Sequence, residues 1–174
     1  MEMKELIINN NKIRSIMKTK LATPILIACA LFMGITSGTG LFEHLFGIPK
    51  MLSSPAAMEA TFTSNSNQPG IFWIPLHGAI LTTLILSLVL NWKSPDRKKL
   101  VLITFVLYMY VSVVSIWFAT QLFEFRELGD TAEFHQRTRQ WMILSWHRAI
   151  IGIVSAVLLM VAISKPGIKN VAQA

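Results

Sequence analysis

The chain has 174 residues, of which 53% are hydrophobic and 14% charged, and its formal net charge is +7. Average soluble domains carry about 25% charged residues, so this composition indicates a membrane protein and excludes a soluble enzyme, a disordered chain or a disulfide scaffold. Positive charge can also indicate nucleic-acid binding, but the chain has no soluble basic patch interleaved with aromatic residues. We therefore expect no nucleic-acid partner and seek another explanation for the charge.

Four long stretches poor in charge divide the chain into predicted membrane spans. Because about 20 apolar residues cross the hydrocarbon core, three stretches are long enough outright, and the fourth becomes so when it is extended back to residue 141. The sequence predicts an all-α fold, a four-helix transmembrane bundle that forms a single membrane domain over 1–174 in a lipid bilayer. The predicted spans are 21–43, 71–92, 99–124 and 141–164, and the predicted outer loops are 44–70 and 125–140.

The distribution of Lys and Arg predicts the orientation of the bundle. Eleven of the 16 lie in the N-terminal segment, the connection after residue 92 and the C-terminal tail, and five lie on the other side. Short loops rich in Lys and Arg stay in the cytoplasm. We expect a multi-pass protein with both termini cytoplasmic, most simply in a bacterial inner (plasma) membrane, and we interpret the net charge as an orientation signal.

The segment before the first span is basic and contains scattered apolar residues. Its run Asn9-Asn10-Asn11 argues against a continuous helix there. The segment also resembles a signal peptide, but the apolar run that follows continues to a full span, which we expect to be retained. The lone Cys29 lies inside this span, so disulfide exchange and thiol–quinone oxidoreductase chemistry are excluded.

Small and ionisable residues occupy the outer part of the first span. The spacing of Gly34 and Gly38 predicts close packing of this helix against a neighbour. Gly40 lies within a turn of Glu43 and His44, where it also leaves room for a ligand.

The second span carries Trp73 and His77, which are four residues apart and therefore share a face of the helix. Counting outward from Trp92 places His77 about one turn inside the hydrocarbon. An ionisable group at that depth is a functional candidate, and the alternative is a hydrogen bond to a neighbouring helix. The turn at 93–97 predicts that the second and third spans are antiparallel neighbours.

The third span presents a stripe that ends in polar residues. Its members are Tyr110, Val114, Trp117, Gln121 and Glu124. An aromatic stripe usually indicates packing or an interfacial belt. The polar end is harder to explain in that way, because Gln121 and Glu124 reach the outer boundary on the same line as Trp117.

The fourth span is the most informative, because a stripe of polar and small residues runs along it. The stripe consists of Trp141, Ser145, Arg148, Gly152 and Ser155. Arg148 and His147 lie about one turn below the outer surface, where insertion of a guanidinium costs ~3 kcal/mol. Arg148 therefore either extends outward to water or pairs with a carboxylate, for which Glu43 and Glu124 are at the same depth.

These polar groups all lie at the outer ends of the four spans, together with three of the four histidines. The inner ends finish in Leu, Val and Ile with Trp92 as an anchor, and we expect nothing comparable there. His135, in the charged second outer loop, is most simply solvated. The sequence therefore predicts a polar, partly buried pocket at the outer end of the bundle.

Several short motifs resemble the small four-helix membrane proteins grouped with fungal anthrone oxygenases. The motifs are Ser37-Gly38-x-Gly40-Leu41-Phe42-Glu43-His44 running into Pro49, Phe72-Trp73-x-Pro75-x-His77, Asn91-Trp92, Trp117-Phe118, Glu124, Arg139-x-Trp141 and Ser145-Trp146-x-Arg148. The resemblance covers about residues 30–165 and implies the same fold, with Glu43, His44, His77 and Arg148 in the site layer. It also implies oxygenation of a polycyclic phenolic ketone without a metal or flavin.

The first functional hypothesis is a cofactor-independent oxygenase or oxidase that acts on a small aromatic or lipophilic substrate. Such an oxidoreductase needs a base and a cation that holds the resulting oxyanion. His77 or His147 would be the base, Arg148 the cation, and Glu43 or Glu124 would orient a histidine. The residues expected to contact the substrate are His44, Trp73, Trp117, Gln121, Glu124, Ser145 and Trp146.

The second hypothesis is a transition-metal or haem site in a membrane oxidoreductase. Its ligands would be His44, His77, His147 and Glu124 or Glu43, because histidines with a carboxylate suit Zn, Cu or non-haem Fe.

The third hypothesis is a non-enzymatic accessory or lipid-binding protein whose outer polar layer is a structural hydrogen-bond network. A homo-oligomer is compatible with all three.

Overall fold

The computed structural model describes residues 2–63 and 69–167, with side chains over 20–63 and 71–167. All regular secondary structure in these two ranges is helical. The elements are α1 (Glu2–Phe42), the π-helical turn η1 (Glu43–Gly47), α2 (Ile48–Met51), α3 (Pro55–Thr63), α4 (Pro69–Leu90), α5 (Pro95–Arg126) and α6 (Ala132–Ser164). The predicted all-α fold is confirmed.

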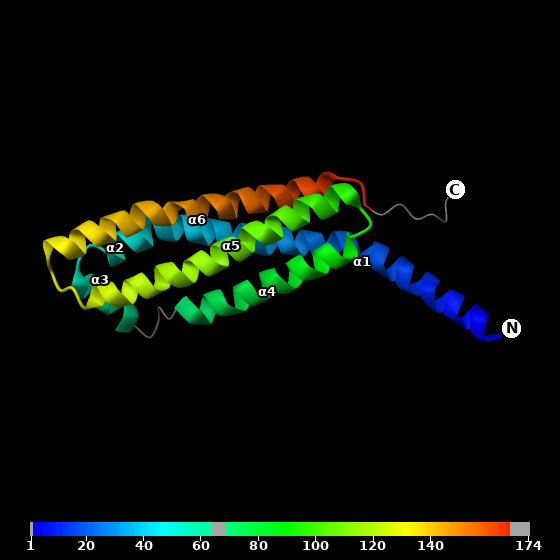
Figure 1. Ribbon diagram of the computed structural model, residues 1–174, viewed down its shortest axis with the longest axis horizontal. Coiled ribbons are helices and arrows are strands. Elements are labelled where there is room, and N and C mark those ends of the chain that lie inside the picture. The colour runs from blue at the N-terminus through cyan, green and yellow to red at the C-terminus, as the bar shows by residue number, and fades with distance from the viewer. Residues whose placement is uncertain (1, 64–68, 168–174) are drawn as a thin grey trace.

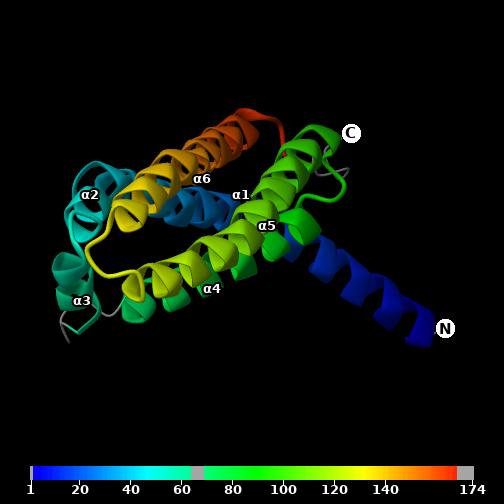
Figure 2. The same cartoon turned by 60° about the vertical axis from the view of Figure 1, so that its left-hand side comes forward.

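Four long helices form the bundle, as predicted. Helix α1 packs against α4 and α6, and α5 packs against the same two helices, so that the four surround a common interior (Figures 1 and 2). Each contains a stretch apolar and long enough to cross a membrane. The candidate spans are Lys20–Met51, Ile71–Leu90, Pro95–Arg126 and Ala132–Ser164.

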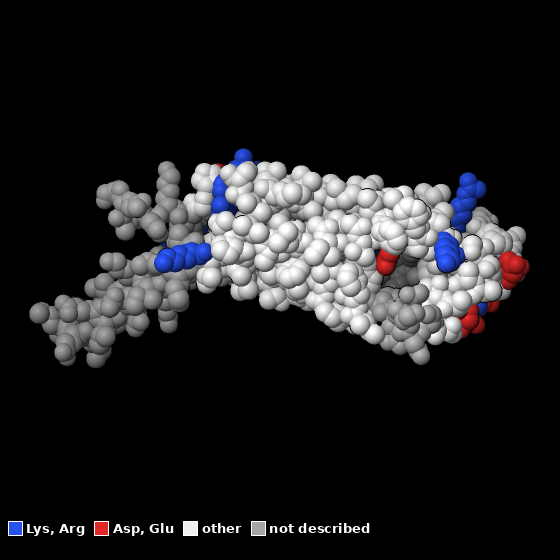
Figure 3. Space-filling view, turned by 180° about the vertical axis from the view of Figure 1, so that it is seen from behind, with Lys and Arg blue, Asp and Glu red and all other residues white. Residues whose placement is uncertain are grey.

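The bundle has two distinct ends. The α4–α5 connection, the end of α6 and the N-terminal part of α1 lie at one end, here called the termini end (Figure 1). η1, α2, α3 and the α5–α6 connection lie at the opposite end, here called the cavity end. Figure 3 shows a broad uncharged band between charged groups at the two ends on one face of the molecule.

Two of the helices are longer than a bilayer crossing requires. α5 and α6 contain 32 and 33 residues, so each is about 50 Å long, whereas the hydrocarbon core is about 30 Å thick. The fourth long helix, α6, begins at Ala132, so the second half of the outer loop predicted over 125–140 is helical.

The predictions of irregular structure at two places are wrong. α1 continues through Asn9-Asn10-Asn11, because an Asn costs a helix interior less than about 1 kcal/mol. The first outer loop, predicted over 44–70, is helical from 44 to 51 and from 55 to 63. Pro55 is the first residue of α3, where proline is tolerated because the first N–H groups of a helix have no helical partner.

The hydrophobic core has two parts. One part fills the middle of the bundle and includes Leu26, Ile80, Leu84, Val101 and Leu159. The other lies at the cavity end and includes Met58, Phe118, Phe125, Phe134 and Trp141. The second part joins α3 to α5 and α6, so it fixes the short helices to the bundle.

The prediction that Gly34 and Gly38 mark a close helix contact is wrong. A Cβ atom added at either position would meet nothing within 4 Å, and both residues are exposed. The close approach of α1 and α6 is instead at Gly152, where a Cβ atom would lie 3.3 Å from Ser37 Oγ. Gly40 is likewise open, and its carbonyl accepts a hydrogen bond from His44.

A polar cluster at the termini end contradicts the expectation that this end is apolar. Arg97 is only 5% exposed and donates hydrogen bonds to Lys165 O (2.9 Å), Thr23 Oγ1 (2.8 Å), Ile163 O (3.3 Å) and Asn91 Oδ1 (3.4 Å). Arg97 belongs to the turn predicted at 93–97, but α5 already begins at Pro95 and buries Arg97. These residues are called the Arg97 cluster.

Candidate functional site

A cavity of about 640 Å³ lies at the cavity end, a volume typical of sites for small molecules. All four long helices and all three short helical elements contribute to its wall. Aromatic side chains dominate the lining, and two ionisable residues face it: Phe42, Phe62, Phe72, Trp73 and Trp141, with Glu43 and Arg148. Figure 3 shows the surface hollowed at this end beside an acidic side chain.

Arg148 is the most unusual group of the cavity, because a buried guanidinium normally pairs with carboxylates. Its guanidinium lies over the ring of Phe118 at 4.3 Å and near that of Trp141 at 5.4 Å. Nη1 donates one long hydrogen bond, of 3.4 Å, to Ser115 Oγ, and the buried Nε has no partner. None of the ion pairs found among the described residues includes Arg148. Several of its N–H donors are therefore free for a ligand.

Glu43 is the second ionisable group of the cavity and is the first residue of η1. The π turn has a local cause, because Pro49 follows it. In a regular α-helix the ring of Pro49 would clash with the carbonyl of Leu45, four residues earlier, and the wider turn provides room. Accordingly, the N–H of Ile48 bonds to Glu43 O, five residues back. Of the two predicted carboxylates, Glu43 is the one that shares the cavity with Arg148.

Trp73 and His77 lie on one face of α4, as predicted, but only Trp73 lines the cavity. The His77 ring lies behind it, with 5.7 Å between the ring centroids. His77 Nδ1 is 2.8 Å from the hydroxyl of Tyr108 on α5. The alternative considered for His77, a hydrogen bond to a neighbouring helix, is thus what the structure shows.

His44 leaves η1 toward α6 and does not line the cavity. Its Nδ1 is 2.7 Å from Gly40 O, and its Nε2 is 3.1 Å from Ser145 Oγ. The ring also packs on Trp146, with centroids 5.2 Å apart. His44, Ser145 and Trp146 therefore join η1 to α6 beside the cavity.

His147 lies on another side of α6 from the cavity lining. Its Nδ1 bonds to the carbonyl of Leu144, and its ring contacts Tyr110 and Phe118, with centroids 6.1 and 5.7 Å apart. Phe118 therefore contacts both neighbours, and of the two only Arg148 lines the cavity. A catalytic base would have to face the cavity, and the His147 ring does not line it.

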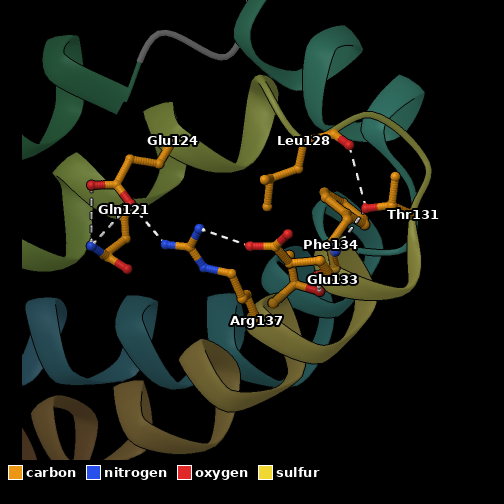
Figure 4. A network of polar contacts seen from close by, with 8 residues as sticks. Gln121, Glu124, Leu128, Thr131, Glu133, Phe134 and Arg137 are labelled. Carbon is orange, nitrogen blue, oxygen red and sulfur yellow. Dashed lines mark hydrogen bonds and ion pairs between the residues drawn. The ribbon is translucent and has the colours of Figure 1, made fainter.

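The polar end of the third predicted span lies outside the cavity. Trp117 is 52% exposed, and Gln121 donates to Glu124 at 3.4 Å. Glu124 forms an ion pair of 2.8 Å with Arg137 of α6, which also contacts Glu133 (Figure 4). Glu124 is therefore a partner of Arg137 and not of Arg148.

The predicted metal ligands do not meet. In the described part of the chain, no group of three or more His, Cys, Asp or Glu side chains could hold a metal ion. His44, His77, His147 and Glu124 contact Ser145, Tyr108, Leu144 and Arg137, respectively. These four side chains therefore do not form one common metal site among the described residues.

Some cavity residues were not identified from the sequence. Ser115, Ala119 and Leu122 form one face of α5 at helical spacing, but their small or apolar side chains gave no chemical signal. Trp141 could have been identified, because it shares the polar stripe of α6 with Arg148.

The chain matches no family model, no curated protein and no solved structure. The likeness to anthrone oxygenases therefore stays a prediction from motifs.

Proposed function

We propose that this integral membrane protein binds a small, flat, lipophilic molecule with an acidic oxygen in the cavity and promotes its base-assisted reaction with O2. The observation that carries the proposal is the cavity-facing Arg148, which is held by aromatic rings and has donors without partners. A phenolate or enolate oxygen would complete its hydrogen bonds. Hydrogen bonds between charged groups of this kind contribute about 1.5–3 kcal/mol each.

The aromatic wall suits a flat substrate. Phe62, Phe72, Trp73 and Trp141 surround the cavity that Arg148 faces. Aromatic rings stack offset or edge-to-face on one another and add about 0.5–1.5 kcal/mol beyond burial. A polycyclic phenolic ketone, the substrate class implied by the motif resemblance, would satisfy both the rings and the guanidinium.

Glu43 is the base in this proposal, in place of the histidines expected from the sequence. It is the carboxylate that lines the cavity with Arg148, whereas His77 and His147 do not line it. Glu43 would take a proton from an activated methylene carbon, and Arg148 would hold the oxyanion that forms. The carbanion then reacts with O2. Overall, the methylene and O2 give a carbonyl and water, so the four electrons lost by carbon reduce both oxygen atoms.

The test is oxygen uptake by purified protein in lipid nanodiscs with a dihydroxyanthrone as substrate, corrected for the rate in empty nanodiscs. Glu43→Gln and Arg148→Gln should each lower the protein-dependent rate about 100-fold, the typical effect of losing a base or an oxyanion donor. Arg137→Gln removes an arginine at the same end that contacts Glu124 and should change little. Uptake that equals the empty-disc rate, or that survives both cavity substitutions, would overturn the proposal.

A further inference from the structure

The π turn η1 determines where Glu43 points. Single π turns are rare and frequently lie at functional sites, because the extra residue changes the rotation of the helix. Successive residues of a helix project about 100° apart. Rewinding the turn to a regular α-helix would therefore move Glu43 around the helix by roughly that angle. The direction of the Glu43 side chain depends on what holds the turn in place.

His44 holds the turn from the adjacent position. The Gly40 carbonyl can only accept, so His44 Nδ1 carries the proton that joins them at 2.7 Å. The other ring nitrogen, Nε2, lies 3.1 Å from Ser145 Oγ, whose hydroxyl also donates to the Met142 carbonyl at 2.9 Å. Both side chains are buried, at 7% and 0% exposure. This arrangement, called the His44–Ser145 clasp, fixes the rotation of η1 against α6.

The clasp also sets the distance between the two ionisable groups of the cavity. Glu43 precedes His44 by one residue, and Arg148 follows Ser145 by three residues, on the same face of α6. Gly47, one turn further along η1, packs beside the Glu43 side chain, because a Cβ atom there would be 3.9 Å from Glu43 Cβ and Cγ. Glu43 and Arg148 therefore each lie within three residues of a residue that forms the His44–Ser145 hydrogen bond.

We infer that His44 and Ser145 are positioning residues that aim Glu43 into the cavity opposite the ligand-binding face of Arg148. The consequence for catalysis rests on the proposed function, whereas the positioning itself does not. In this view His44 takes no proton from the substrate, and its role ends at the orientation of its neighbour.

The test uses fluorescence that does not depend on activity. Cys29 is the lone cysteine, so Cys29→Ser with Glu43→Cys gives a single thiol at position 43 for labelling with bimane. Tryptophan quenches bimane only at short range, and Trp73 and Trp141 line the same cavity. We expect several-fold quenching in nanodiscs, relieved when Trp73→Phe and Trp141→Phe are added.

The clasp variants then decide the inference. Ser145→Ala, and His44→Phe beside it, should raise the bimane fluorescence toward that of the double Trp→Phe protein, and Ser145→Thr, which keeps the hydroxyl, should retain the quenching. Quenching that is unchanged in Ser145→Ala would overturn the inference, even if thermal stability falls, because a purely structural contact would change stability alone. Relieved quenching in the labelled variants, together with no oxygen uptake by the protein that retains Glu43, would support the clasp and contradict the proposed function.

Discussion

Two arginines of the same bundle, the buried Arg97 and the half-buried Arg148, show opposite hydrogen bonding. Arg97, at the termini end, donates to four acceptors on α1, α6 and the neighbouring turns. Arg148, at the cavity end, has one long hydrogen bond, two aromatic neighbours and a buried Nε without a partner. A buried charge without hydrogen-bond partners is costly. We therefore expect Arg97 to contribute to stability, whereas Arg148 has the free donors that the proposed ligand requires.

The largest expected difference is in stability. Arg97→Met removes the donors of the Arg97 cluster and leaves buried carbonyl groups unpaired, so we expect a loss of about 3 kcal/mol in the free energy of unfolding. Arg148→Met removes a cation–π contact of about 0.5–2 kcal/mol and also the ~3 kcal/mol cost of burying the guanidinium. Its stability should therefore stay the same or rise slightly.

Unfolding in mixed micelles, followed by circular dichroism, measures both effects. Arg139→Met is the control, because Arg139 is exposed on α6. Equal losses for the Arg97 and Arg148 variants would break the distinction between the two ends.

The pair of His77 and Tyr108 lies between these extremes and sharpens the comparison. Tyr108 is buried and hydrogen-bonded, like Arg97, but His77 adjoins Trp73 of the cavity. The Tyr108 hydroxyl contacts both Nδ1 and the carbonyl of His77, so Tyr108→Phe should cost about 1–2 kcal/mol of stability and should leave ligand affinity within about twofold. Unfolding and binding titrations on the same preparation measure the two quantities. A loss of affinity without loss of stability would instead place His77 among the ligand-binding groups.

The smallest effect is expected at a third arginine, which is exposed. Arg126, at the end of α5, contacts Glu59 of α3 at 2.7 Å, and α3 contributes Phe62 to the cavity wall. Exposed ion pairs contribute about 0–1 kcal/mol and weaken with salt. Glu59→Gln should therefore lower stability by less than about 1 kcal/mol, and only at low ionic strength. A larger, salt-independent loss in thermal unfolding would mean that this contact, and not apolar packing, holds α3.

The sequence predicted most of the fold, because membrane spans depend on composition over long segments. Charge-poor runs identified the four long helices and their order. It also predicted one polar end, with Arg148 and Glu43 in a common site. Both residues stood out because an ionisable group near the hydrocarbon is costly.

The remaining features depend on rotation of helices, which periodicity fixes only roughly. Of two neighbours on α6, Arg148 lines the cavity and His147 does not, and the sequence alone did not separate them. The Arg97 cluster was missed because charges in a short turn are usually solvated. Pro49 could have predicted the π turn, because proline does not fit inside a regular helix. The effect of that turn on the direction of Glu43 could not be predicted, because it depends on the contact between His44 and Ser145 of α6.

The most direct test of the central claim, that Arg148 binds an acidic oxygen, compares two flat probes of the same ring system in nanodiscs. Energy transfer from tryptophan to anthracene measures the binding of anthracene carboxylate and of neutral anthracene methanol. Wild-type protein should prefer the carboxylate about tenfold, which corresponds to about 1.4 kcal/mol. Arg148→Gln should abolish the preference, and Arg137→Gln should keep it. An equal preference in wild type and Arg148→Gln would contradict the account.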